Sequence, residues 1–212
     1  MRDNTALHAA CLQSNDGVVA LLTVTPEQWR ERFGWGDAKA DFVLRSMRAL
    51  AESLESLNIP VRVIEQPTFD GLDEAIVELM RDAKCDALFF NREYEHYEQQ
   101  RDESVSATVS EAGYSIQAKT DQTIYAPEPV RTKQDKVYTV FTPFKKRFWE
   151  RWKEGDRPEC HPSPKRQQKL DLESDCLPSS IDGFDDPDLD GTWPAGEDHA
   201  LSRLEAFITD RL

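Results

Sequence analysis

The sequence lacks the features of a membrane, secreted or metal-binding protein. It has no apolar run of about 18 residues and no apolar core near its start, so neither a membrane span nor a signal peptide is expected. The four histidines have no metal-ligand spacing. The four cysteines form neither a C-x-x-C pair nor a zinc pattern, and they are Cys11, Cys85, Cys160 and Cys176. We therefore expect reduced thiols, no metal site and a cytoplasmic protein.

Two features of phosphate-binding proteins are also missing. No glycine-rich loop follows any expected strand, and G-K-S or G-K-T does not occur, which argues against an unrelated nucleotide-binding domain. The 26 Lys and Arg residues are outnumbered by 40 Asp and Glu residues, giving a net charge of −14. Binding to a phosphate backbone requires clustered Lys and Arg side chains, so the chain alone is not expected to bind DNA.

The sequence does contain an alternation of short apolar runs and long amphipathic segments. Nearly continuous apolar runs are typical of strands buried on both faces. Helices of ten or more residues between such strands indicate a parallel sheet, whose carboxyl edge is where ligands bind. The predicted fold is α/β with a doubly wound parallel sheet, with strands at 18–24, 60–65 and 86–91 and helices at 37–57, 71–83 and 97–112.

The composition changes after Trp152. Residues 154–196 are rich in Pro, Asp, Glu, Ser and Lys, which is typical of a linker with little regular structure. A helix with an apolar stripe is expected over 197–212. The chain is thus divided into an α/β domain at 1–153, a linker at 154–196 and a helix at 197–212.

A polar, acidic segment follows the third expected strand. It contains four Glu or Asp carboxylates, two tyrosines and a histidine between Arg92 and Asp102. One interpretation is a solvated acidic loop, with Glu98 favoured near a helix N-terminus by the helix dipole. The other is a ligand site, because this segment follows a strand at the carboxyl edge of the sheet.

Five motifs in order along the chain resemble the DNA photolyase and cryptochrome family. The most informative is V-F-T-P-F-K-K-R-F-W, in which Thr142 is expected to cap a helix whose first turn holds Pro143. The others are D-N-T-A-L, T-P-E-Q-W, the N-x-x-Y-E-x-x-E-x-x-R-D pattern, and W-P-A-G-E with a following apolar helix, at residues 3–7, 25–29, 91–102 and 193–207.

The resemblance implies an antenna domain that binds a light-harvesting chromophore. Tyr97 and Glu98 fall where folate-binding members place an Asn-Glu pair against a pterin, so these two residues are the implied cofactor site. A carboxylate suits the paired donors of a pterin. Tyr97 departs from that pattern, and Arg32 stands where some members have a histidine. The implied antenna is methenyltetrahydrofolate or a deazaflavin, with another flavin or an empty cleft left open.

The resemblance also implies parts that are missing from the sequence. The family's first strand would precede Met1, and its helical FAD-binding domain would follow the last helix. FAD and the DNA lesion are thus expected only in a full-length protein, with no catalytic residue in this chain and no repair by it alone. The alternative is a cryptochrome-like or degenerate interaction module using the face of Phe144, Phe148 and Trp149. Self-association through the 197–212 helix is a further expectation.

Overall fold

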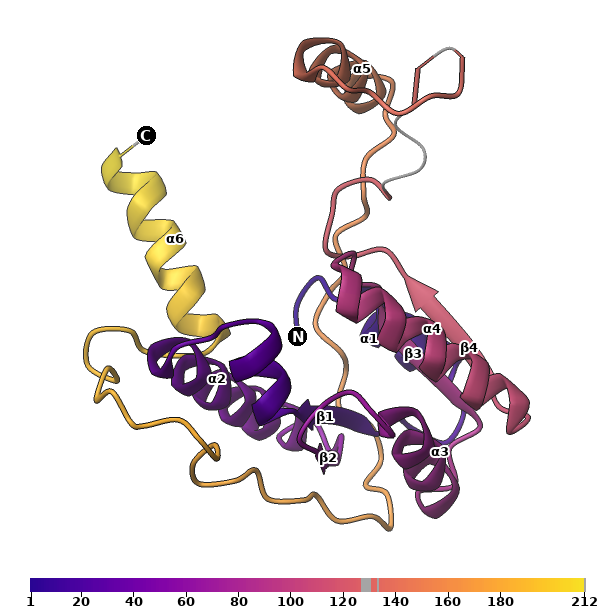
Figure 1. Cartoon of the computed structure of the whole chain (residues 1–212), viewed down its shortest axis with the longest axis vertical. Coiled ribbons are helices and arrows are strands. Elements are labelled where there is room, and N and C mark those ends of the chain that lie inside the picture. Colours follow the sequence, from indigo (N-terminus) through magenta and orange to yellow (C-terminus); the bar gives the residue numbers. More distant parts are fainter. Residues whose placement is uncertain (127–130, 133, 212) are drawn as a thin grey trace.

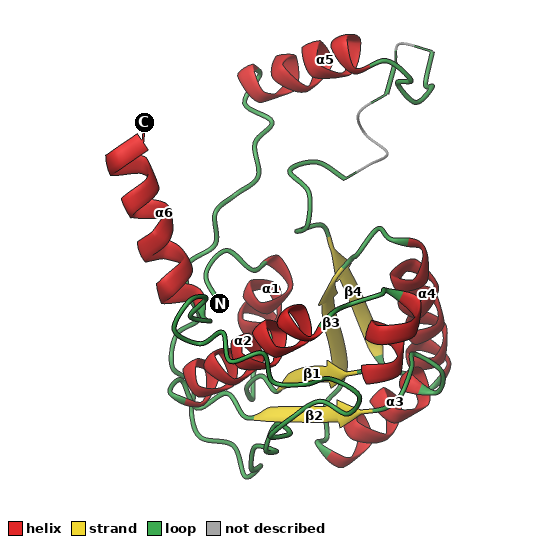
Figure 2. Cartoon of the chain, turned by 60° about the vertical axis from the view of Figure 1, so that its left-hand side comes forward, coloured by secondary structure: helices red, strands yellow, loops and turns green. Residues whose placement is uncertain are grey.

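The computed structural model describes residues 1–126, 131–132 and 134–211, and it contains two pairs of parallel strands. Leu212, the last residue of the predicted final helix, lies outside the described residues. The pairs are turned relative to one another, with helices on either side (Figure 2). This confirms the predicted α/β fold. The first pair is β1 (Ala20–Val24) with β2 (Val61–Glu65), and the second is β3 (Ala87–Asn91) with β4 (Ser115–Lys119).

Helices precede or follow every strand, as parallel pairing requires. A π-helical turn, η1 (Gln28–Arg32), follows β1. No helix in the described ranges is long and apolar enough to cross a membrane. The helices around the strands are α1 (Thr5–Gln13), α2 (Asp37–Glu55), α3 (Leu72–Asp82) and α4 (His96–Glu111), and two more, α5 (Phe141–Lys153) and α6 (Glu197–Arg211), come later in the chain.

The apolar side chains of each strand alternate between two layers of helices, as the period of two in a strand dictates. Leu21 and Ile64 of the first pair, together with Leu88 and Ile116 of the second, pack against the buried residues of α3 and α4. Val61 lies in a separate cluster with Leu54 of α2, against which Ala20 and Leu22 also pack. The core is therefore split between the two sides of the strands.

β1 and β3 are not hydrogen-bonded to each other in the described part of the chain. The sequence predicted β3 as a buried strand, and this is wrong. All five of its residues are half-buried despite the apolar run from Ala87 to Phe90. The physical reason is that one edge of β3 has no neighbouring strand and borders a cavity.

The two later helices stand away from the α/β body (Figure 1). Neither contains a buried residue. The predicted start of the aromatic helix is off by one residue: α5 begins at Phe141 with Val140 as its cap, so Thr142 lies inside the first turn and caps nothing. Pro143 fits there because the amides of the first turn lack helical acceptors.

Residues 154–196 contain no helix or strand, yet part of this segment packs closely against the domain. The Ser174 hydroxyl accepts a hydrogen bond from the Val61 amide, and the Asp175 amide donates to the Val61 carbonyl oxygen (2.8 Å). Ile181 is 5% exposed in a cluster with Val24 and Trp29. The segment therefore covers the outer edge of β2, which would otherwise present unpaired backbone groups.

Asp175 is expected to stabilise this contact in a pH-dependent way. Its carboxylate accepts hydrogen bonds from Arg62 Nε (2.8 Å) and the Val63 amide (2.9 Å). Burial alone would raise the pKa of Asp175, but these donors outweigh it and the pKa lies below its ordinary value of 3.8. The stabilisation is therefore complete above pH 3.8 and lost as the pH falls through the lowered pKa.

Asp175→Asn should lower the free energy of unfolding at pH 7 by about 1 kcal/mol, the low end for a charged hydrogen bond because solvent screens the half-exposed pair. Urea unfolding at pH 7 and below pH 3.8 measures this, with the exposed Glu173→Gln as control. An equal loss at both pH values would contradict the electrostatic role.

Candidate functional site

Aromatic side chains from three loops meet at the carboxyl edge of the strands. Phe33 follows β1, Phe69 follows β2, and Tyr97 lies in the first turn of α4 after β3. The ring centroid of Phe33 is 6.0 Å from that of Phe69 and 6.2 Å from that of Tyr97. Such contacts require the carboxyl ends of β1, β2 and β3 to lie at one edge, which is where α/β sheets bind ligands.

The end of β3 is fixed by a polar network. The side-chain oxygen of Asn91 accepts a hydrogen bond from the Ala6 amide (2.9 Å). Its amide group donates to Asn4 Oδ1 and to Asp121 Oδ2, both at 3.1 Å. Asn91 thus joins the start of α1 and the segment after β4 to the loop that leads into α4.

Arg101 connects the aromatic loops to the acidic segment. Its side chain is 18% exposed and forms ion pairs with Glu93 (2.8 Å) and Asp102 (2.7 Å). The guanidinium carbon lies 5.1 Å from the ring centroid of Phe69. A planar, permanently charged group suits this combined pairing and stacking. Arg101 therefore holds the first turns of α4 against the loop after β2.

Glu98 has a buried carboxylate oxygen without a hydrogen-bond partner. In the described part of the chain, unpartnered buried side-chain oxygens are found on Glu98 (Oε2) and on Gln66 (Oε1), and both follow strand ends at this edge. Burial raises the pKa of Glu98, and the Glu93 and Glu95 carboxylates raise it further, although Arg101 and a backbone amide act in the other direction. A buried acceptor of this kind is costly unless something donates to it.

The site combines acceptors with an accessible ring and is suited to binding a flat, hydrogen-bonding ligand. Tyr97 is 39% exposed, so its ring is available for stacking. Glu98 accepts hydrogen bonds when ionised and donates one when protonated. No group of three or more His, Cys, Asp or Glu side chains in the described ranges is arranged to hold a metal ion.

The structure places the two residues predicted from sequence, Tyr97 and Glu98, in the first turn of α4 at this edge. Sequence reasoning missed Phe33, Phe69 and Arg101, which complete the surroundings. Phe33 and Phe69 lie in loops and Arg101 lies in the second turn of α4. Each follows a predicted strand, and that position was the available signal. Arg32, which stands where some family members have a histidine, is exposed and lies at the end of η1.

The fold and this edge define an α/β domain with aromatic and acidic side chains gathered at the carboxyl ends of its parallel strands. A family model described as DNA photolyase matches residues 1–166, which is more than half of the chain. The chain therefore belongs to the DNA photolyase family, and it corresponds to the family's N-terminal α/β domain.

Individual relatives support the same assignment. The deoxyribodipyrimidine photo-lyase of Vibrio cholerae is 38% identical over 147 residues, which is 69% of this chain and 31% of that protein. The enzyme of the same name from Salmonella typhimurium is 31% identical over 98% of this chain and 43% of that protein. The crystal structure of a class III photolyase from Agrobacterium tumefaciens has a TM-score of 0.75 at 22% identity, covering 98% of this chain and 42% of that one. The chain thus spans less than half the length of these relatives.

Replacing Glu98 should stabilise the ligand-free protein. Because its folded pKa is raised above the ordinary value of 4.5, ionisation of Glu98 opposes folding at neutral pH. This penalty is absent below pH 4.5 and complete above the raised pKa. Glu98→Gln should therefore increase the free energy of unfolding at pH 7 by up to about 1 kcal/mol, since an amide is cheaper to bury than a carboxylate.

Chemical unfolding at pH 7 and pH 4 tests this expectation. The exposed Glu103→Gln on the same helix serves as the matched control and should change little at either pH. A destabilised Glu98→Gln protein at pH 7 would show that the carboxylate is satisfied within the protein.

Proposed function

We propose that the edge of the domain beside Tyr97 and Glu98 holds a light-harvesting antenna chromophore of the pterin type, such as methenyltetrahydrofolate. The observation that carries this proposal is the buried, unpartnered Oε2 of Glu98 next to the half-exposed ring of Tyr97. The amino group and ring nitrogen of a pterin would supply the donors that this carboxylate lacks. The tyrosine ring would stack on the flat ligand.

A deazaflavin or another flavin is the competing antenna. Tyr97 replaces the Asn expected for folate binding, and a large aromatic side chain favours stacking over paired amide hydrogen bonds. The photolyase family uses a flavin together with an antenna chromophore, so both ligand classes are compatible with membership. Parallel titrations with the two compounds separate these alternatives.

In the whole protein we propose light-driven repair of pyrimidine dimers in DNA. The antenna would pass excitation energy to FAD, which would supply the electron for dimer cleavage. FAD and DNA would be held by parts outside this chain, in which we assign no catalytic residue. A net charge of −14 supports assigning DNA binding to those parts, because binding a duplex requires an excess of clustered Lys and Arg. We place the protein in the cytoplasm.

An interaction module is the second candidate, favoured by the exposed apolar side chains of the two later helices. Phe141 and Trp149 of α5 are 71% and 47% exposed. Leu204, Phe207 and Ile208 of α6 are each more than half exposed. Faces of this kind are sites of protein association, including self-association through α6. A protein that binds neither pterin nor flavin but forms oligomers through these residues would favour this candidate.

Glu98→Gln should weaken methenyltetrahydrofolate binding roughly ten-fold or more, from ~1.5–3 kcal/mol per charged hydrogen bond. Fluorescence titration of the purified chain measures this, and Glu103→Gln on the same helix should bind as the parent does. Because Glu98→Gln is expected to be at least as stable as the parent, lost affinity would not reflect misfolding. Unchanged affinity would remove Glu98 from the site, and tighter binding of a deazaflavin than of the folate would replace the pterin.

A further inference from the structure

The composition of α5 sets it apart from the rest of the chain. Its 13 residues include five aromatic and five basic side chains, and none of them is Ala, Val, Leu, Ile or Met. A single Glu accompanies the five basic residues, in a chain whose net charge is −14. α5 is therefore a cationic, aromatic helix on an acidic protein.

The aromatic side chains of α5 form a continuous stripe. Most of them recur at intervals of three or four residues, which places them on one face of a helix. Neighbouring ring centroids lie between 5.9 and 6.4 Å apart in the order Phe141, Phe144, Phe148, Trp149 and Trp152. The stripe thus runs along the whole helix.

Much of this stripe is open to solvent. The rings of Phe141 and Trp149 are exposed. Tyr125 covers only the middle of the stripe, with its ring centroid 5.0 Å from that of the half-buried Phe148. Figure 1 shows that α5 itself stands apart from the α/β body. No residue that the structure describes therefore buries the rings of Phe141 and Trp149.

Basic side chains lie along both margins of the stripe. With about 3.6 residues per turn, Lys146 and Lys153 lie beside Trp149 on one margin. Arg147 and Arg151 lie on the other margin by the same spacing. The helix therefore presents an apolar surface bordered by positive charge on both sides.

The lysines provide the free cations of this surface. Arg147 forms ion pairs with Glu150 (3.6 Å) and Glu154 (3.9 Å), and Arg151 pairs with Asp156. The three lysines of α5 are exposed, and none of them forms an ion pair within the described ranges. Their charges are thus available to an anionic partner.

We propose that α5 binds the surface of an anionic lipid bilayer and lies in the interface with its aromatic stripe toward the acyl chains. Aromatic rings concentrate at this interface, and lysine side chains reach lipid phosphates while their apolar stems stay in the membrane. At 13 residues α5 is too short to cross a bilayer, which needs about 20. The proposal goes beyond the antenna site and does not depend on it.

The shape and composition of α5 favour a lipid surface over two other partners. The apolar face of α6 is mainly aliphatic, with Leu201, Leu204 and Ile208, and such side chains are typical of protein cores. α5 contains no aliphatic side chain of this kind. Single-stranded nucleic acid follows a positively charged groove, whereas α5 is a single convex helix.

Sedimentation of the whole chain with vesicles tests the proposal. At ~0.1 M salt the protein should bind vesicles of equal parts phosphatidylglycerol and phosphatidylcholine, and not phosphatidylcholine alone, and about 1 M salt should weaken binding. Lys146→Glu combined with Lys153→Glu should weaken it at least ten-fold, because each lysine near an anionic surface adds to the affinity. Tryptophan emission should move to shorter wavelength on binding, and Trp149→Phe should remove most of that shift.

The matched control is Lys165→Glu combined with Lys169→Glu, which reverses two exposed lysines outside the helices and strands. It carries the same change in net charge and should bind nearly as the parent does. Equal weakening by the two pairs, absence of binding to the anionic vesicles, or an emission shift that survives Trp149→Phe would overturn the proposal. Binding of single-stranded DNA that requires Lys146 and Lys153, without binding of vesicles, would assign α5 to nucleic acid instead.

Discussion

The apolar cluster between α3 and α4 joins the two strand pairs into one body. Leu72, Ile76 and Met80 of α3 and Val105 and Val109 of α4 form its buried part. Leu21 and Ile64 reach it from the first pair, and Leu88 and Ile116 reach it from the second. Because no hydrogen bonds join β1 to β3 in the part of the chain that the structure describes, side-chain packing fixes the relation between the pairs. Ser104 and Thr108 of α4 reinforce it by donating to Asp73 of α3.

The geometry of the site at the carboxyl edge follows from this arrangement. Because the strands are parallel, the loops that carry Phe33, Phe69 and Tyr97 lie at one edge. Arg101 then holds α4 to the loop after β2 by stacking on Phe69 while pairing with Glu93 and Asp102. The unpartnered carboxylate oxygen of Glu98 lies beside these ion pairs, and burial raises the pKa of its carboxyl group. Such a local cost is expected where a binding site, rather than the fold, determines the residue.

Much of the fold could be predicted because periodicity and length decide strand and helix type locally. The strands expected at 18–24, 60–65 and 86–91 are present with slightly shorter bounds. Tyr97 and Glu98 were accessible through the motif that contains them. Phe33 and Phe69 were not, since their proximity depends on how three loops converge. The partial exposure of β3 was likewise inaccessible, because an apolar run does not reveal whether both of its neighbours are present.

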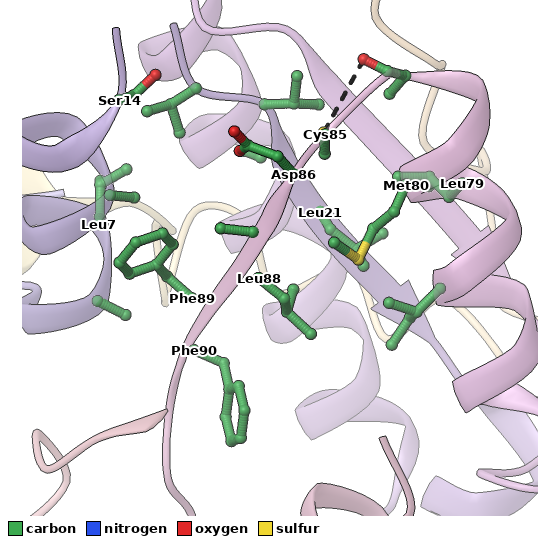
Figure 3. Close-up of a pocket in the computed structure, with 18 of the residues that line it drawn as sticks. Leu7, Ser14, Leu21, Leu79, Met80, Cys85, Asp86, Leu88, Phe89 and Phe90 are labelled. Carbon is green, nitrogen blue, oxygen red and sulfur yellow. Dashed lines mark hydrogen bonds between the residues drawn. The ribbon is translucent and has the colours of Figure 1, made fainter. Parts of the chain in front are cut away.

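The outer edge of β2 and the inner edges of β1 and β3 differ in what covers them. The outer edge of β2 is covered by Ser174 and Asp175, which supply hydrogen bonds from a segment whose composition is that of a linker. Composition did not predict this role, since a polar segment needs only a few well-placed donors and acceptors to pair with a strand. Among the residues that the structure describes, the inner edges of β1 and β3 receive no such cover and border a cavity instead (Figure 3). Unpaired backbone groups beside apolar walls are costly unless another backbone, a polar side chain or water satisfies them. The outer edge of β2 and the inner edges of β1 and β3 therefore differ in whether protein groups satisfy their backbone amides and carbonyls.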